Sequence, residues 1–356
     1  MPINLNKPIE PDIDELTFYL KGVNERGWYT NFGPLHEKLT KELEEYLNVE
    51  NLLLVANGTL ALQVASETLG VKSALTTPFS FVATSSALLW QKIELGYCDI
   101  DESSYNISPT EIERTLIEDN EYDAIVATHV YGNPCDLKAL ENLASKYNKK
   151  IIYDAAHCFG VNVGNDSILS FGDASTLSFH ATKIFHTIEG GAIVFKHRKD
   201  YEKAKELISF GSKNLPGINA KLNEYQCAVG LTLLRNIKQV IEHRRSLFVS
   251  YRDRLEGVAD MPLWYENTDY NGAYMPIFIP EEEKQDALLR KFDENNIQSR
   301  RYFSPSLDQL FPNCSNYGCT NSHLKANGTI CLPLHYYMTQ SDVDIVCDLV
   351  EKVLEN

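Results

Sequence analysis

The first half of the chain alternates short apolar runs with longer amphipathic stretches. Short continuous apolar runs are typical of strands buried on both faces, and apolar residues spaced three and four apart are typical of helices. The pattern predicts strands over residues 52–55, 74–77, 93–98, 123–129, 150–154, 174–179 and 191–195. It predicts helices over residues 59–69, 81–91, 109–117 and 136–147. This alternation favours an α/β fold, with a mostly parallel sheet of seven strands between helices.

The pattern changes in the second half of the chain. It predicts one long helix over residues 223–251, a short apolar strand over 274–279, and helices over 281–294 and 340–354. A chain of 356 residues is longer than one ordinary core needs. We therefore expect a large domain over residues 12–240, a smaller α+β domain over 241–356 and an N-terminal arm over 1–11.

The composition is that of a globular protein with an acidic surface. Lysine and arginine number 33 against 49 aspartates and glutamates, which gives a formal net charge of −16. This balance disfavours nucleic acid as a partner. It would also repel an anionic substrate, so such a substrate needs cations of its own within the site.

Several classes of protein are disfavoured by what the sequence lacks. The first residues have neither the basic nor the apolar part of a signal peptide, and no apolar run approaches bilayer length, so we expect a cytoplasmic protein without a membrane partner. Eight scattered cysteines without a C-x-x-C pair favour reduced thiols and no metal site. The glycine fingerprints of dinucleotide and P-loop proteins are missing, as are H-E-x-x-H and G-x-S-x-G.

Ligands of parallel sheets bind beyond the carboxyl ends of the strands, so the residues there are the first candidates for chemistry. Lys183 closes the run SFHATK directly after the strand 174–179, and a Gly-Gly pair precedes the next strand. A lysine in this place is either part of a surface turn or a nucleophile, and a nucleophile would need an aldehyde partner.

Asp154 ends the strand 150–154, and His157 follows three residues later. A carboxylate at a strand end either caps a helix or faces a basic group. Opposite a pyridine nitrogen, it would keep that nitrogen protonated and make the ring an electron sink. His157 is either structural or faces the same ring.

Two further strand ends complete the pattern. Gly58 and Thr59 open the helix after the first strand, where free N–H groups and the helix dipole favour a phosphate, although the pair would also serve as a plain cap. Phe81 follows the second strand and is either a core residue or a platform for a flat ring. Together, these four positions favour a phosphorylated aromatic aldehyde bound to a lysine.

At this point the chain resembles the DegT–DnrJ family of sugar aminotransferases, which use pyridoxal 5'-phosphate and have the fold-type-I architecture. The resemblance rests on GWYTNFGPLHEKLTKELEEYL (27–47), VANGTLALQVA (55–65), TTPFSFVATSSALLW (76–90), IIYDAAHCFGV (151–161), LSFHATKIFHTIEGGAIVF (177–195), PGINAKLNEYQCAVGL (216–231) and LPLHYYMTQSDV (332–343).

The resemblance implies a role for each matching residue. Lys183 would bind the cofactor covalently and act as the catalytic acid and base. Asp154 would face the ring nitrogen, His157 the polar ring edge and Phe81 the ring face. The phosphate would be bound by Gly58, Thr59 and Ser178, and by Asn219 of a second subunit, which implies a homodimer with shared active sites.

The resemblance also implies a ping-pong reaction that moves an amino group from L-glutamate, through pyridoxamine phosphate, to a nucleotide-linked keto sugar. Dehydrating relatives carry histidine in place of the lysine, so Lys183 favours transamination. A 3-keto sugar, a UDP-linked sugar or a substrate of the scyllo-inosose type is an open alternative. So are a non-catalytic pyridoxal-phosphate-binding regulator and an unrelated Rossmann-like protein, which the missing basic module and glycine fingerprint respectively disfavour.

The residues that would hold the sugar are less well marked. The N-terminal candidates are Trp28, Tyr29, Thr30 and Asn31, which precede a Gly-Pro pair. The remaining candidates are cations for a pyrophosphate and two ring side chains, namely Lys213, Lys221, Arg244, Arg301, Tyr302 and His335. Each cation is otherwise a solvated surface charge.

Overall fold

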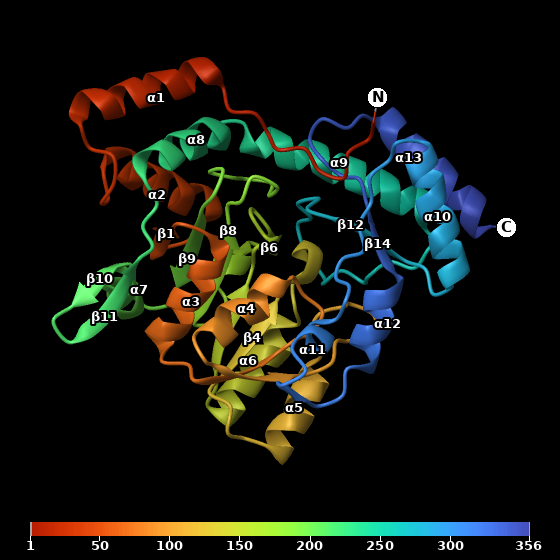
Figure 1. Ribbon diagram of the computed structural model, residues 1–356, viewed down its shortest axis with the longest axis horizontal. Coiled ribbons are helices and arrows are strands. Elements are labelled where there is room, and N and C mark those ends of the chain that lie inside the picture. Colours follow the sequence, from red (N-terminus) through yellow and green to blue (C-terminus); the bar gives the residue numbers. More distant parts are fainter. Residues whose placement is uncertain (1, 356) are drawn as a thin grey trace.

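The computed structural model describes residues 2–355, and its central feature is an eight-stranded sheet of strand order β1-β9-β8-β5-β4-β2-β3-β13 (Figure 1). The predicted strands are β1 (Leu52–Val55), β2 (Ser73–Thr76), β3 (Glu94–Tyr97), β4 (Ala124–Thr128), β5 (Lys150–Asp154), β8 (Ala174–Ser178) and β9 (Gly191–Phe195). Within this sheet, β9 runs opposite to the other seven strands. The predicted mostly parallel α/β sheet is therefore confirmed, with one added strand.

Side chains alternate between two cores because successive residues of a strand point to opposite faces. Leu52 and Leu54 of β1 pack into one core, and Leu53 and Val55 pack into the other. The first core is covered by α2 (Pro34–Leu47), α5 (Pro109–Glu118), α6 (Leu137–Tyr147) and α8 (Glu224–Leu234). The second is covered by α3 (Gly58–Leu69), α4 (Val82–Trp90) and α7 (Arg198–Leu207).

The single long helix predicted over 223–251 is in fact two helices, α8 and α9 (Ile237–Leu255). Asn236 interrupts them with non-helical dihedral angles. The break has a packing reason, since α8 is buried in the first core whereas the far end of α9 belongs to a third core. The N-terminal helices α1 (Ile13–Arg26) and α2 were not singled out by the pattern of apolar residues.

The third core lies in the C-terminal half. It gathers α9, β12 (Met275–Phe278), α10 (Glu282–Glu294), β14 (Thr329–Leu332) and α13 (Gln340–Leu354). The strands β12 and β14 pair in antiparallel fashion. A separate core in this half agrees with a smaller α+β domain, while its boundary at residue 241 stays a prediction.

The C-terminal half also reaches back to the large sheet. Between the helices α11 (Leu307–Leu310) and α12 (Thr320–Gly328), the two-residue strand β13 (Ser315–Asn316) pairs with β3 at the sheet edge. Just beyond it, the carboxylate of Asp99 accepts hydrogen bonds from the backbone N–H groups of Asn321 and Ser322, both at 2.8 Å. The two halves are thus joined by hydrogen bonds as well as by α9.

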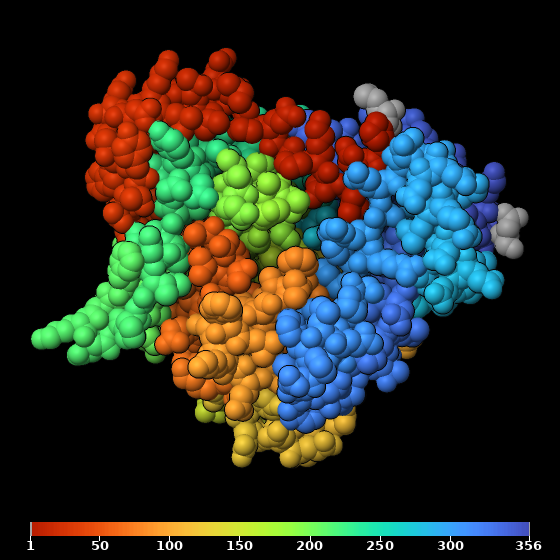
Figure 2. Space-filling view, in the orientation of Figure 1, coloured from red at the N-terminus to blue at the C-terminus, as the bar shows by residue number. Residues whose placement is uncertain are grey.

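Short elements complete the described chain. The strands β6 (Asn162–Val163) and β7 (Asp166–Ser167) form a small hairpin, and two turns of 3-10 helix lie at η1 (Val130–Gly132) and η2 (Ile168–Ser170). A second hairpin, β10 (Ser209–Ser212) and β11 (Leu215–Asn219), projects from the body of the molecule (Figure 2).

The N-terminal segment before α1 runs along the molecule and contacts both halves. Ile3 pairs with Ile297 and packs into the third core. Further on, the carbonyl oxygen of Ile9 accepts a hydrogen bond from Nε2 of His186 at 2.9 Å, and Asn6 donates to the carbonyl oxygen of Thr182. The N-terminal segment therefore contacts the loop that carries Lys183 on both sides of that residue.

Two general features of the described chain bear on its class. Within residues 2–355, no helix has the length and apolar character needed to cross a bilayer. All eight cysteines are free thiols, and the described residues contain no cluster of three or more side chains of metal-ligand type.

Candidate active site

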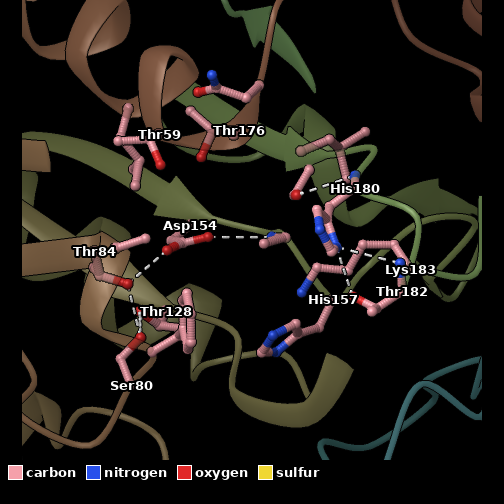
Figure 3. A pocket seen from close by; sticks show the side chains of 18 of the residues that line it. Thr59, Ser80, Thr84, Thr128, Asp154, His157, Thr176, His180, Thr182 and Lys183 are labelled. Carbon is pink, nitrogen blue, oxygen red and sulfur yellow. Dashed lines mark hydrogen bonds between the residues drawn. The ribbon is translucent and has the colours of Figure 1, made fainter. Parts of the chain in front are cut away.

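A cavity of about 330 Å³ opens at the carboxyl ends of the parallel strands, where the sequence placed its candidates (Figure 3). The predicted residues that line it are Gly58, Thr59, Phe81, Asp154, His157, Ser178, Lys183 and Tyr302. Five separate stretches of sequence therefore converge on one site.

The first turn of α3 forms an anion cradle. The side chain of Asn57 accepts a hydrogen bond from the N–H of Leu60 at 2.8 Å, and the N–H groups of Gly58 and Thr59 have no partner inside the helix. A Cβ atom on Gly58 would lie 2.9 Å from the Cβ of Ser178 on β8, so a side chain there would crowd the cradle. Free N–H groups at a helix N-terminus beside a hydroxyl fit a phosphate.

Asp154, at the end of β5, presents a buried carboxylate to the cavity. Its Oδ2 accepts from the hydroxyl of Thr84 at 2.7 Å, and its Oδ1 accepts from the N–H of Ala156 at 3.2 Å. Burial raises the pKa of Asp154, which these hydrogen bonds and the nearby charge of Lys183 partly oppose. A buried carboxylate with few partners fits a protonated ring nitrogen.

His157 supplies a polar atom without a partner. Its side chain is buried, and Nδ1 makes no hydrogen bond to any described residue. Burial holds the pKa of His157 well below its ordinary value, so the ring is neutral. The imidazole lies parallel to the ring of Phe303, with centroids 6.0 Å apart. An unpaired buried nitrogen in the cavity wall fits the polar edge of a bound ring.

Lys183 lies in the loop after β8, with its amine inside the cavity (Figure 3). Burial lowers the pKa of Lys183 to about 8, against the opposing attraction of Asp154. A lysine with this pKa is neutral in a useful fraction near neutral pH and can act as a nucleophile and as a base.

Phe81 remains half exposed at the start of α4, which leaves its ring free to contact a ligand in the cavity.

Sequence reasoning missed part of the lining. The additional residues with polar or aromatic side chains are Ser80, Thr84, Thr128, Thr176, His180, Thr182, Glu189, Tyr274, Arg300 and Phe303. The sequence singled out Arg301, but its neighbour Arg300 lines the cavity. Arg301 instead lies 3.3 Å from the carboxylate of Asp286. Arg300 pairs with Cys331 of β14, and neighbouring side chains of an extended segment point to opposite sides, so only one of the two arginines could face the cavity. No local pattern showed which one.

Other candidates lie outside the cavity of this chain. Lys221 donates to Asn219 Oδ1 at 2.7 Å beside the projecting hairpin. Arg244 is buried and donates to the carbonyl oxygens of Gly272 and Ala273, so it braces a loop. Burial lowers the pKa of His335 to about 4. The other candidates that do not line the cavity are Trp28, Tyr29, Thr30, Asn31 and Lys213. Their contacts with substrate, and that of Asn219 with a phosphate, stay predictions.

The cavity is suited to bind pyridoxal phosphate, because it gathers a buried amine, a buried carboxylate, an unpaired imidazole nitrogen and a helix N-terminus. The chain matches the DegT/DnrJ/EryC1/StrS aminotransferase family over residues 12–351, and it belongs to that family. It is therefore a pyridoxal-phosphate-dependent transaminase, and the predicted fold-type-I architecture and cofactor are confirmed.

Two named relatives and one solved structure are similar to this chain over nearly its whole length. The chain is 36% identical to a dTDP-4-amino-4,6-dideoxy-D-glucose transaminase of Shigella dysenteriae, with 99% of both chains covered. It is 32% identical to the enzyme of that name from Escherichia coli, covering 99% of this chain and 98% of the relative. A crystal structure of DesI in the presence of its TDP-sugar product superposes with a TM-score of 0.92 at 26% identity, covering 99% of this chain and 92% of that one.

Proposed function

We propose that the protein transfers an amino group from L-glutamate to dTDP-4-keto-6-deoxy-D-glucose and forms dTDP-4-amino-4,6-dideoxy-D-glucose. The observation that carries this proposal is the identity of 36% with a transaminase named for that product, over nearly the whole of both chains. A second relative of the same name and the similar structure of DesI in the presence of its TDP-sugar product support the same substrate class.

The residues of the cavity would divide the work of such a reaction. When bound, pyridoxal phosphate supplies an electron sink that stabilises charge on the carbon that loses a proton. The amine of Lys183 takes that proton from the donor's α-carbon and later delivers one to the sugar carbon. Asp154 would hold the ring nitrogen protonated, and His157 would hydrogen-bond the polar ring edge. Gly58, Thr59 and Ser178 would bind the phosphate.

Arg300 is the residue in this cavity best placed to receive an anionic substrate. It is exposed at the cavity wall, and its guanidinium donates to the hydroxyl of Tyr302 at 3.2 Å. The chain as a whole carries a formal charge of −16, so a local cation is needed where a carboxylate or pyrophosphate binds. We assign to Arg300 the binding of this anion, and to Tyr302 a contact with the substrate beside it.

We further propose a homodimer in which each active site is shared. The hairpin β10–β11 projects from the body, exposes 67% of Phe210 and carries Asn219 at its base, where it pairs with Ser209 (Figure 1). An apolar side chain on a projecting hairpin fits a surface that a second copy covers. Asn219 would then reach the phosphate of the neighbouring site. We place this dimer in the cytoplasm, in the supply of amino sugars for lipopolysaccharide and O-antigen.

An absorbance experiment tests the substrate. The purified holoenzyme is mixed with L-glutamate, then with dTDP-4-keto-6-deoxy-D-glucose, and product masses are measured. Loss of the visible cofactor band with glutamate, its return with the sugar and the mass of the amino sugar would support the proposal. A band that glutamate bleaches but only a UDP-linked or 3-keto sugar restores would refute the substrate and keep the enzyme class.

A further inference from the structure

Three buried hydroxyl groups form a chain that ends on the carboxylate of Asp154 (Figure 3). Thr128 Oγ1 lies 3.1 Å from Ser80 Oγ, Ser80 Oγ lies 2.8 Å from Thr84 Oγ1, and Thr84 Oγ1 lies 2.7 Å from Asp154 Oδ2. All three hydroxyl side chains are at most 2% exposed. The chain links the end of β4, the loop after β2 and the first turn of α4 to the end of β5.

The order of donors in this chain follows from counting hydrogens. Each hydroxyl has one hydrogen to donate. Thr84 donates its hydrogen to the carboxylate, so it accepts from Ser80, and Ser80 in turn accepts from Thr128. In the opposite order, the hydrogen of Thr128 would need a further acceptor, and its hydroxyl has no other hydrogen-bond partner among the described residues.

We propose that Thr84 and Ser80 are positioning residues that keep the Asp154 carboxylate ionised and aimed at the cofactor's ring nitrogen. The assignment rests on the proposed role of Asp154 opposite that nitrogen. The hydroxyl chain donates in one direction, toward the carboxyl group of Asp154, and an ionised carboxylate accepts a stronger hydrogen bond from it than the neutral acid does. Aligned hydrogen bonds of this kind polarise one another and strengthen the last bond of the series.

The hydroxyl chain opposes the effect of burial on the charge of Asp154. Burial raises the pKa of Asp154, which favours the neutral acid, and the hydrogen bond from Thr84 is the largest opposing contribution. A neutral acid would leave the ring nitrogen without the counter-charge that keeps it protonated. Thr84 therefore acts on the chemistry through Asp154.

The test uses the holoenzyme loaded with pyridoxal phosphate labelled with ¹⁵N in the ring. The ¹⁵N chemical shift reports protonation of the ring nitrogen directly and does not depend on turnover. We expect Thr84→Val to move the signal toward that of an unprotonated pyridine and to lower kcat about tenfold, as loss of a hydrogen bond to a charged group does. Ser80→Ala moves it less, and Thr84→Ser keeps the wild-type signal.

Two controls separate the possible failures. Thr115→Val removes another fully buried hydroxyl, on α5, and leaves the signal unchanged. Asp154→Asn shifts the signal if Asp154 faces the ring nitrogen. A shift in Asp154→Asn without one in Thr84→Val and Ser80→Ala overturns the role of the hydroxyl chain alone. An unchanged signal in Asp154→Asn overturns the proposed role of Asp154 and this inference with it.

Discussion

Gly58 stands so close to Ser178 that a Cβ atom on the glycine would lie 2.9 Å from the Cβ of the serine. The contact joins the first residue of α3 to the last residue of β8, on either side of the anion cradle. The close approach requires glycine because any side chain would push the two elements apart.

Gly58→Ala should therefore weaken cofactor binding by about tenfold or more, through displacement of Ser178. Equilibrium dialysis with pyridoxal phosphate measures this effect. Gly22→Ala, within α1, is the matched control, because there the new Cβ meets only the flexible end of Arg26 at 3.0 Å. Equal cofactor binding by the two variants would contradict the proposed phosphate site.

The pKa of Lys183 predicts how the apoprotein takes up its cofactor. Only the neutral amine attacks an aldehyde, and a lysine pKa of about 8 leaves about one tenth of the amine neutral at pH 7. The second-order rate of uptake should rise about tenfold per pH unit up to about 8 and then level off. Stopped-flow absorbance measures this rate. A rise that continues to pH 10 would indicate an ordinary lysine.

Arg300 and Arg301 offer a matched pair of substitutions. Arg300→Gln removes a charge from the cavity wall, and we expect KM for an anionic substrate to rise about tenfold or more. Arg301→Gln breaks only an exposed contact with Asp286 and should change KM less than about twofold. Steady-state kinetics with each substrate varied in turn shows which anion Arg300 binds. A larger effect of Arg301→Gln would restore the sequence-based assignment.

The shared active site predicts complementation between two defective variants. Lys183→Ala lacks the catalytic amine, and Asn219→Ala lacks the proposed contact with the neighbouring phosphate. A refolded equimolar mixture should recover about one quarter of wild-type activity, because half of the random dimers are hybrids and each hybrid holds one intact site. Activity that remains at the mean of the two separate variants would show that each site is built from one chain.

The pattern of apolar residues predicted the sheet, and the ends of its strands predicted one side of the cavity. Strand ends such as those before Asp154 and Lys183 follow continuous apolar runs, and parallel topology brings such ends to one edge. Local sequence thereby predicted which side chains meet, although they lie far apart in the chain.

The C-terminal side of the cavity was harder to predict. Tyr274, Arg300 and Phe303 lie in short or irregular segments whose apolar residues show no long period. Their placement depends on how the third core packs against the sheet, which no local pattern contains. The break between α8 and α9 escaped prediction similarly, since both helices carry apolar residues without interruption by glycine or proline at Asn236.

The attachment of the C-terminal half to the sheet edge limits how this enzyme can open and close. Many enzymes admit substrate by a hinge motion of one domain. Here such a rotation would have to separate β13 from β3 and pull Asn321 and Ser322 from Asp99. These contacts favour small movements of side chains that line the cavity, such as the exposed Arg300 and the adjoining Tyr302. The rate of product release should depend on these two side chains rather than on the hinge.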